Sequence, residues 1–462
     1  MVAALVYALA PISGAHLNPA VSACVALSGK AQARVSVVLG YMCAQMCAGA
    51  LAGLCLYMLP GFETSAKGVS EAPAGWALAS FAEAAYTCLL CFVLLNACCA
   101  QANRGNQFYG IAVGFAVIAG GYAAGGAATF NPAMSAGFDV ALRNRDAGLM
   151  LCRTLAEFAG AAAAAGLFRL VRPDEAGGEP SGTLARFLSE FVGSFYFTLT
   201  VILGLITESV SLVPSTAWAA TASIACLTYS LASVSGANFN PAVSLGIFLG
   251  GREKLGLMEF IAYAALQLTA GAAAGALVGA LGSADSLPQE ALRGGPHRAA
   301  CAAELLFTSA LVFSVLCVAT RALSWQSARN HFGLAIACSA TAGIVGLGSA
   351  SGGALNPATA LGIAAARLSY DVFALHVRRA GLWALCQLLG AALAAGLFRV
   401  LYFREYDESF LMSMGRGNPG AAEVGAMVGN NEKPEGSSRY CGVNQQSTFA
   451  FNRQRTCRVC TG

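Results

Sequence analysis

The sequence predicts an all-α integral membrane protein that repeats one helical unit in tandem. Three observations lead to this fold class: the composition, a series of long apolar segments and an internal repeat. Of the 462 residues, 57% are hydrophobic and 11% are charged, whereas an ordinary soluble domain has about 25% charged residues. The net charge of +4 is too small to indicate a nucleic-acid-binding protein.

Residues that commonly carry chemistry are sparse. The 4 His are scattered, and most of the 17 Cys lie inside apolar segments, which argues against a disulfide scaffold or a metalloenzyme. Near the C-terminus, Cys441, Cys457 and Cys460 have no nearby His and do not complete a tetrahedral metal site. We therefore expect no cofactor, no metal and no enzymatic activity.

Apolar segments of about 20 residues, long enough to cross a bilayer, recur along the chain. They are rich in Ala, Gly, Leu and Val, which favours helices over the strands of a membrane barrel. Pairs of small residues at helical spacing, such as Gly49/Gly53, Gly110/Gly114 and Gly271/Gly275/Gly279, predict close helix packing. The predicted helices span 35–59, 76–100, 108–128, 147–171, 184–206, 216–235, 256–281, 299–320, 331–351 and 377–402.

The chain repeats itself. GAHLNPAVS at 14–22 returns as GANFNPAVS at 236–244, and GAAAAAGLFR at 160–169 returns as GAALAAGLFR at 390–399. Each half contains two Asn-Pro-Ala tripeptides at similar intervals. These are Asn18-Pro19-Ala20 with Asn131-Pro132-Ala133, and Asn240-Pro241-Ala242 with Asn356-Pro357-Ala358.

Each Asn-Pro-Ala predicts the start of a short helix, because Asn is a good N-cap and Pro is favoured at the first helical position. A helix that begins inside the membrane needs protein or a water-lined cavity around its free N–H groups. Two such half-helices from opposite sides would direct their positive ends and two Asn amides at a lumen. A neutral solute could then pass by exchanging hydrogen bonds, while a cation would meet a barrier.

With these motifs the chain resembles the aquaporin (major intrinsic protein) family. SEFVGSFYFTLT with Glu190 resembles the first helix of that family, and AEAAYTCLLCF and AELLFTSALVF resemble its fourth helix. The resemblance implies two tandem units of transmembrane helices, each with two re-entrant half-helices. It also implies that Glu83, Glu190 and Glu304 accept hydrogen bonds from re-entrant loops.

The resemblance also places the selectivity constriction. Where typical water channels of the family have an Arg after the second Asn-Pro-Ala, this chain has Met134 and Thr359. The other constriction positions, aligned by spacing, are Ala119 and Ala128 in the first unit and Ala220, Ile344 and Gly353 in the second. A neck without a fixed cation leaves glycerol, urea, ammonia or hydrogen peroxide open beside water.

The expected organisation is a first unit at 1–172, a linker at 173–183, a second, complete unit at 184–404 and a disordered cytosolic tail at 405–462. Only Met1–Ser13 precede the first motif segment, so we expect the first unit to lack helix one and part of helix two. The linker is expected in the cytosol, and the protein is expected to be a multi-pass protein of the plasma membrane or an intracellular membrane. The partners implied are the bilayer, water and small neutral solutes, with self-association as a dimer of tandem units.

Two other functions remain open. A coupled secondary transporter also uses inverted repeats and broken helices, and it would need a titrating group such as Glu157 on its path. A non-conducting membrane scaffold is suggested by the short first unit. Arg153 and Glu157, four residues apart, are expected to form a structural ion pair.

Overall fold

The structure is a computed structural model, and it describes most of the chain as far as Asp407. The described residues are 1–31, 33–59, 75–125, 128–142, 147–178, 182–211, 215–252, 254–282, 287, 297–321, 330–347, 351, 353–367 and 373–407. Cys441, Cys457, Cys460 and nearly all of the expected tail lie outside them. Within the described residues the regular structure is entirely helical.

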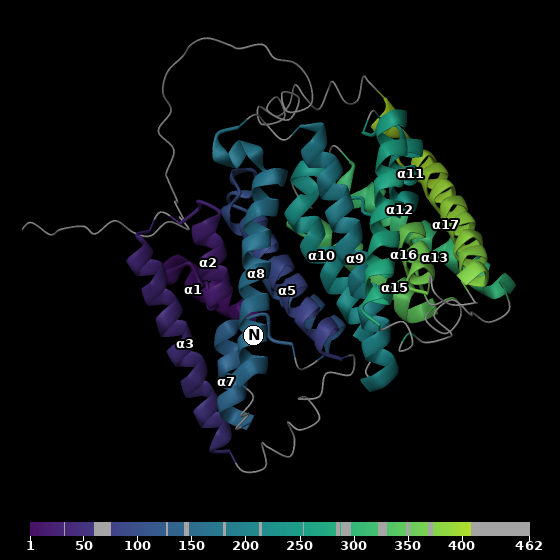
Figure 1. The fold of residues 1–462 in the computed structure, drawn as a ribbon. Coiled ribbons are helices and arrows are strands. Elements are labelled where there is room, and N and C mark those ends of the chain that lie inside the picture. Colours follow the sequence, from purple (N-terminus) through teal and green to yellow (C-terminus); the bar gives the residue numbers. More distant parts are fainter. Residues whose placement is uncertain are drawn as a thin grey trace, which may run out of the picture.

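The helices fall into two groups that lie side by side, coloured purple to blue and teal to yellow in Figure 1. We name the first group unit one and the second group unit two. Unit one consists of α1 (Val2–Ser13), α2 (Pro19–Leu27), α3 (Val35–Tyr57), α5 (Gly75–Leu94), the π-helix η1 (Leu95–Cys99), η2 (Gln101–Asn103), α6 (Tyr109–Ala124), α7 (Pro132–Leu142) and α8 (Ala147–Val171). After η3 (Pro173–Ala176), unit two consists of α9 (Thr183–Ser211), α10 (Ser215–Ser235), α11 (Pro241–Gly250), α12 (Leu257–Ala280), α13 (His297–Ala319), α15 (Phe332–Leu347), α16 (Pro357–Ala365), α17 (Phe373–Leu401) and η5 (Phe403–Tyr406).

The two units repeat the same contacts. The half-helices α2 and α7 of unit one correspond to α11 and α16 of unit two, and α5·α8 packing corresponds to α13·α17 packing. Helix α9 packs against α12 and α16. In the described part of unit one, no helix covers α3 and α7 in this way.

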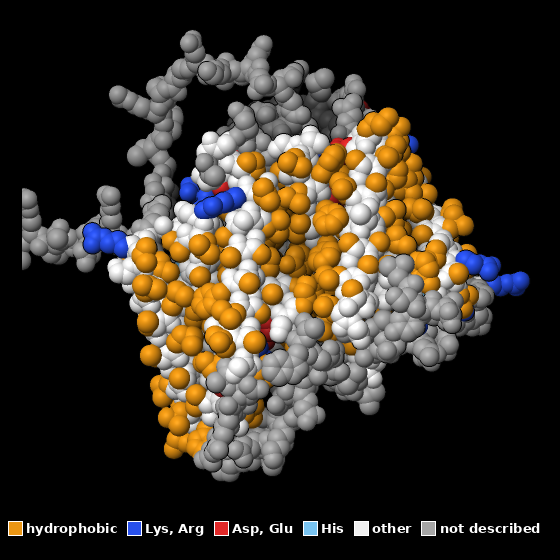
Figure 2. Space-filling model, viewed as in Figure 1, with side chains coloured by type: hydrophobic (Ala, Val, Ile, Leu, Met, Phe, Trp, Pro, Cys, Tyr) orange, Lys and Arg blue, Asp and Glu red, His pale blue; other side chains and the backbone are white. Residues whose placement is uncertain are grey.

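Eight of the described helices are long and apolar enough to cross a membrane. Hydrophobic side chains spread over the outer surface with few charged groups between them, as Figure 2 shows. Leu39 and Leu51 on α3 are 54% and 62% exposed. Such a surface suits lipid rather than water, and the fold confirms the predicted all-α membrane class.

The predicted glycine seams bring helix backbones together. A Cβ added to Gly53 would lie 2.1 Å from the carbonyl oxygen of Gly137 on α7. A Cβ added to Gly275 would lie 1.9 Å from the carbonyl oxygen of Gly362 on α16. Any side chain at these positions would push the half-helix away from its long neighbour, so the seams hold α7 and α16 in place.

The units contact each other through α5 and α6 of unit one and α9 and α10 of unit two. The Tyr86 hydroxyl donates to Thr200 Oγ1 at 3.1 Å. The rings of Phe108 and Tyr229 stack with their centroids 4.4 Å apart. Aromatic and hydroxyl contacts therefore join the units across their apolar helices.

Arg172, directly after α8, also links the units. It is 2% exposed, and its Nε donates to Asn96 Oδ1 at 3.1 Å. Its Nη2 donates to the carbonyl oxygen of Ser230 at 3.2 Å and to Ser233 Oγ at 2.7 Å. Burial lowers the pKa of this guanidinium, and these acceptors compensate part of the lost hydration. The signal in the sequence was only a basic residue at a helix end.

Candidate functional site

Each Asn-Pro-Ala tripeptide starts a short helix with the Asn as N-cap. The Asn oxygen accepts from the backbone N–H two residues later, at 2.8 Å for Ala20, 3.0 Å for Ala133, 2.9 Å for Ala242 and 2.9 Å for Ala358. The Pro at the first position has no N–H to satisfy. The local sequence therefore fixes where all four half-helices α2, α7, α11 and α16 begin.

The residue before each of these Asn has a left-handed backbone. The φ angles are 53° at Leu17, 55° at Phe130, 51° at Phe239 and 50° at Leu355. Bulky residues rarely adopt this conformation, and it persists only where the surroundings hold it. In all four copies the carbonyl group of this residue accepts a hydrogen bond from the Asn of the opposite half-helix.

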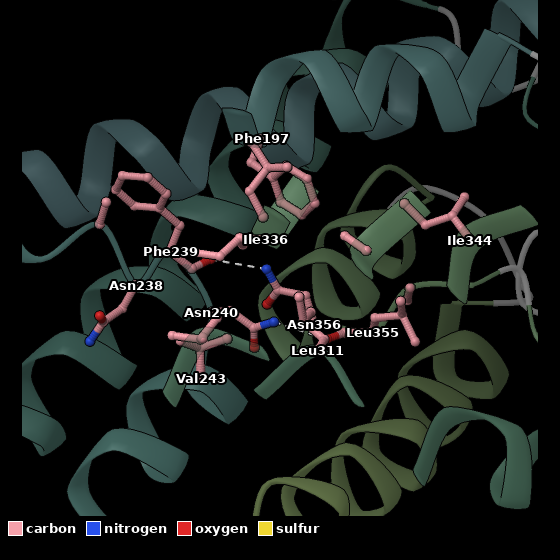
Figure 3. Close-up of a pocket in the computed structure, with 15 residues that line it drawn as sticks. Phe197, Asn238, Phe239, Asn240, Val243, Leu311, Ile336, Ile344, Leu355 and Asn356 are labelled. Carbon is pink, nitrogen blue, oxygen red and sulfur yellow. Dashed lines mark hydrogen bonds between the residues drawn. The ribbon is translucent and has the colours of Figure 1, made fainter. Parts of the chain in front are cut away.

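In unit two the two half-helices brace each other head to head. Asn240 Nδ2 donates to the carbonyl oxygen of Leu355 at 2.9 Å, and Asn356 Nδ2 donates to that of Phe239 at 2.9 Å (Figure 3). A primary amide has two N–H donors. One N–H of each Asn is therefore used for bracing, and the described structure gives no partner for the second N–H.

Unit one repeats this arrangement. Asn18 Nδ2 donates to the carbonyl oxygen of Phe130 at 2.7 Å, and Asn131 Nδ2 donates to that of Leu17 at 3.1 Å. Asn18 is 4% exposed, but Asn131 is only half-buried and Met134 is 46% exposed. In unit one the Asn at the start of α7 is therefore more exposed than the Asn at the start of α2.

Two buried carboxylates hold the re-entrant loops of unit two. Glu190 on α9 accepts from the N–H of Asn238 at 3.0 Å and from that of Phe239 at 2.8 Å. Glu304 on α13 accepts from the N–H of Ala354 at 3.2 Å and from that of Leu355 at 3.0 Å. Both glutamates are 0% exposed.

In unit one two carboxylates meet at the second loop. Glu83 on α5 accepts from the N–H of Thr129 at 3.0 Å and from that of Phe130 at 2.8 Å. Glu157 on α8 accepts from the next N–H, that of Asn131, at 2.9 Å. The ion pair expected between Arg153 and Glu157 is wrong: Glu157 contacts the loop, and the described residues show no salt bridge between the two side chains.

The first loop of unit one is held differently. No carboxylate bonds to this loop in the described part of unit one. Instead His16 Nδ1 lies 3.1 Å from Ser22 Oγ, and Gln45 Nε2 donates to Ser22 Oγ at 3.1 Å. Unit two has the same kind of network, in which Asn238 and Gln267 donate to Ser244 Oγ, and Glu190 is added to it there.

Two neighbouring cavities lie beside the braced pair of unit two. A cavity of about 20 Å³ lies at the two Asn, enough for a single water. A wider cavity of about 180 Å³ shares Asn238 and Ile336 with its lining and reaches Lys254 in the loop after α11. Apolar side chains that spacing alone did not single out complete the narrow part: Phe197, Ile224, Val243, Leu311, Ile336 and Ala340. Val243 belongs to α11, and the other five come from α9, α10, α13 and α15 around the half-helices (Figure 3).

The predicted constriction residues fall into two sets. Ile344 lines the narrow cavity, and a Cβ at Gly353 would lie 2.9 Å from the Ile344 Cα, so these two lie together. Ala220 and Thr359 are 0% exposed and are absent from the lining. The Thr359 hydroxyl lies 3.2 Å from that of Thr198 on α9.

In unit one the corresponding residues differ widely in exposure. Ala119 on α6 is 0% exposed, Ala128 is half-buried and Met134 is 46% exposed.

The expected boundary of the tail needs one correction. Glu405 and Tyr406 belong to the helical turn η5, and Glu405 is 5% exposed. Its carboxylate pairs with Arg252 at 3.5 Å and with Arg321 at 3.2 Å. Glu175, after α8 in unit one, is the matching residue and pairs with Lys30. These clamps follow the same repeat as the motifs, since both carboxylates come six residues after the repeated GLFR segments.

Comparisons with known proteins agree with this geometry. The family model described as major intrinsic protein matches residues 1–168 and again 179–376. The chain is 30% identical over 212 residues to aquaporin NIP1-4 of Oryza sativa subsp. japonica, a match that spans 44% of this chain and 76% of that protein. It is 33% identical over 187 residues to probable aquaporin-3 of Gibberella zeae, spanning 38% of this chain and 58% of the fungal protein. The match to probable aquaporin PIP-type 7a of Pisum sativum is 34% identical over 88 residues, 18% of this chain and 30% of the pea protein.

Each matched region contains one pair of half-helices that start at Asn-Pro-Ala and brace each other through their asparagines. The matched regions together cover most of the chain. The chain therefore belongs to the major intrinsic protein family, a family of membrane channels rather than enzymes, and is a multi-pass membrane protein with two such regions in tandem.

Proposed function

We propose that the chain is a passive channel that conducts water and small uncharged solutes, such as glycerol, through unit two. The observation that carries this proposal is the braced pair Asn240 and Asn356, which leaves one amide N–H on each residue for a passing solute. The rest of the narrow lining is mainly apolar. A solute that passes in single file would form hydrogen bonds with the two amides and would find few other hydrogen-bonding groups in the narrow part.

Ion exclusion follows from the same pair of helices. The N-terminal ends of α11 and α16 meet at the narrow cavity, and a helix N-terminus carries partial positive charge. No charged side chain lines this part of the cavity. A cation would therefore lose its hydration shell without a compensating anion, while a neutral solute would lose little.

The test is flux in reconstituted vesicles measured by stopped-flow light scattering with water, glycerol and urea. Ala340, which is 2% exposed and lines the narrow cavity, provides the control. Ala340→Trp should abolish the added flux, because the large ring fills the path. Flux that depends on a proton gradient would favour a coupled transporter. Vesicles no more permeable than empty ones would favour a non-conducting scaffold.

We further propose that two chains pair as a dimer of tandem units in the membrane, with the linker and tail in the cytosol. Unit one uses α5 and α6 to bind unit two. The matching helices of unit two, α13 and α15, leave Leu306 and Val345 60% and 67% exposed. The same kind of apolar face could receive a second chain. Native mass spectrometry in detergent measures the fraction of dimer in the wild type and in the variants Leu306→Lys and Val345→Lys. The dimer should be present in the wild type and should be lost in both variants, because each places a charge in the apolar face.

A further inference from the structure

Four equivalent long-helix positions bond to a half-helix, a re-entrant loop or the carboxylate that holds the loop, and one of them differs chemically. The positions are Gln45 on α3, Glu157 on α8, Gln267 on α12 and Gln387 on α17. Three are amides and one is a carboxyl group. Because Glu and Gln have nearly the same shape, the difference lies in the hydrogens that they carry.

In unit two the amide nitrogen at this position supplies a hydrogen to a buried carboxylate. Gln267 Nε2 donates to Glu190 Oε2 at 2.8 Å, and Gln387 Nε2 donates to Glu304 Oε2 at 2.8 Å. In unit one the residues that match Gln387 and Glu304 are Glu157 and Glu83. If both of these glutamates were ionised, neither would have a hydrogen to donate to the other.

Both carboxyl groups are withdrawn from solvent and bound to the same loop. Glu83 and Glu157 are 2% and 0% exposed. The N–H of Thr129 donates to Glu83 and the hydroxyl of Thr129 donates to Glu157, at 3.0 Å and 2.8 Å. Thr129 thus lies in hydrogen-bond contact with both carboxyl groups.

The two oxygens of Glu157 have unequal surroundings. Oε1 accepts from the Thr129 hydroxyl, the Asn131 N–H and the Ser135 hydroxyl, at 2.8, 2.9 and 3.0 Å. Oε2 is buried and has no hydrogen-bond partner in the described structure. Because Oε1 binds the loop, Oε2 is the atom left to do what the Gln387 amide nitrogen does in unit two. A buried carboxylate oxygen without a hydrogen-bond partner destabilises the fold through the loss of its hydration. A protonated oxygen at the same position is neutral and can donate a hydrogen bond.

We propose that Glu83 and Glu157 form a proton-binding pair that holds one proton, with Glu157 Oε2 as its site, beside the second Asn-Pro-Ala of unit one. One proton taken from the aqueous phase changes the charge of the pair from −2 to −1. The bound proton supplies the donor that an amide supplies at the same place in unit two. Two carboxyl groups sharing a buried site typically do not both ionise.

The surrounding charges favour one bound proton. Arg153, one turn before Glu157 on α8, acts electrostatically on Glu83 and balances the remaining charge of the pair. Asp139, one turn after Ser135 on α7, has another interaction. Helices α2, α6, α10 and η1, which pack on α5 or α8, contain no Asp, Glu, Lys, Arg or His. The remaining charged groups on α8, η3 and α9 have partners or contacts elsewhere: Arg169, Asp174, Glu175, Arg186, Glu190 and Glu208.

Infrared difference spectroscopy on the full chain in vesicles tests the proposal directly. The spectrum of the wild type at about pH 7 should contain a protonated-carboxyl C=O band that Glu157→Gln removes. The reverse variant, Gln387→Glu, should create a second such band by placing the same pair in unit two. If the wild type and E157Q had the same protonated-carboxyl bands at neutral pH, the proposal would be overturned, because Glu157 would then be ionised in the wild type.

Stability against pH gives a second readout that does not depend on conduction. The pair must release its proton as the pH rises, which leaves two facing charges, whereas the amide of E157Q is unchanged. The unfolding temperature of E157Q relative to the wild type should therefore rise from about pH 5 to about pH 9. A constant difference over this range, or a wild type that becomes relatively more stable at high pH, would contradict a bound proton.

Discussion

Unit one and unit two contain the same braced Asn pair in different surroundings. In unit two, α9 packs on α12 and α16, and Asn356 and Thr359 are 1% and 0% exposed. In unit one the described structure has no such helix, and Met134, which corresponds to Thr359, is 46% exposed. The loop conformation is nevertheless the same, down to the left-handed residue before each Asn.

This difference separates two contributions to the site. The N-caps, the crossed Asn bonds and a carboxylate on the second loop occur in both units, and the first loop has the same shape with Glu190 in unit two and without a carboxylate bond in the described part of unit one. The outer helix α9 and its Glu190 bury the pair in unit two, and the described part of unit one has no corresponding contact. Geometry therefore follows from the tripeptides, while enclosure depends on the long helices around them.

The largest effect is expected from Glu190→Ala. The variant leaves the N–H groups of Asn238 and Phe239 and the amide of Gln267 without their acceptor. Each buried donor left unpaired costs about 1–3 kcal/mol, so unit two should lose about 4 kcal/mol of stability. Thermal unfolding in detergent measures this loss.

His16→Ala in unit one is the matched control, because its loop already forms without a carboxylate and keeps the bond between Gln45 and Ser22. We expect a loss of about 1 kcal/mol there, that of one net hydrogen bond. Equal losses in the two variants would mean that Glu190 does not distinguish the units.

A smaller effect should come from filling the glycine seams. Gly275→Val places a side chain against the carbonyl group of Gly362, and Gly53→Val does the same against Gly137. Overpacking of this kind costs about 1–3 kcal/mol. Helix α12 is held from behind by α9, whereas α3 is not covered in the described structure and can move outward.

We therefore expect Gly275→Val near the upper end of this range and Gly53→Val near the lower end. Unfolding temperatures of the two single variants, measured in the same detergent, provide the comparison. If Gly53→Val were the more damaging, α3 would be held by something other than α2 and α7.

Much of this comparison was predictable from the sequence. The apolar segments gave the helices to within a few residues at most ends, as for 147–171 and 216–235 against α8 and α10. The Asn-Pro-Ala tripeptides gave the half-helix starts, because the signal for an N-cap followed by Pro is local. Features that depend on neighbouring residues and on the spacing of apolar residues can therefore be predicted without knowing the tertiary contacts.

Contacts between distant helices were harder to predict. The spacing of Arg153 and Glu157 suggested an ion pair, but a backbone N–H at Asn131 competes for the carboxylate once the loop is folded. Spacing also identified Thr359, yet only packing shows that its hydroxyl lies against Thr198. The repeat offered a usable signal, since the position that holds Gln387 in one half holds Glu157 in the other.

The constriction of the two units can be compared by flux. Thr359→Arg in unit two should reduce glycerol flux about tenfold, equivalent to about 1.4 kcal/mol of added barrier, and water flux less, because the guanidinium narrows the enclosed neck. Met134→Arg in the open unit one should change either flux little. Stopped-flow measurements on vesicles with matched protein content check both, and an unchanged glycerol flux in T359R would show that the constriction lies elsewhere.

The smallest effects are expected at the carboxylate clamps that end each unit. Glu405 pairs with Arg252 and Arg321 and is 5% exposed, whereas Glu175 pairs with the single cation Lys30. Glu405→Gln should cost about 1 kcal/mol and Glu175→Gln about half of that, within the range of partly exposed ion pairs.

Salt separates the two clamps further, because screening weakens accessible pairs more than enclosed ones. The exposed fraction of the side chain is 18% for Lys30, 9% for Arg252 and 25% for Arg321. Glu175 has one partly exposed cation, whereas Glu405 keeps its pair with the more enclosed Arg252 when salt screens its pair with Arg321. The loss caused by Glu175→Gln should therefore shrink more in about 1 M salt than that caused by Glu405→Gln. Unfolding temperatures of both variants at low and high salt measure this. A larger salt effect on the Glu405 variant would mean that the more exposed Arg321, rather than the more enclosed Arg252, provides most of the stabilisation of that carboxylate.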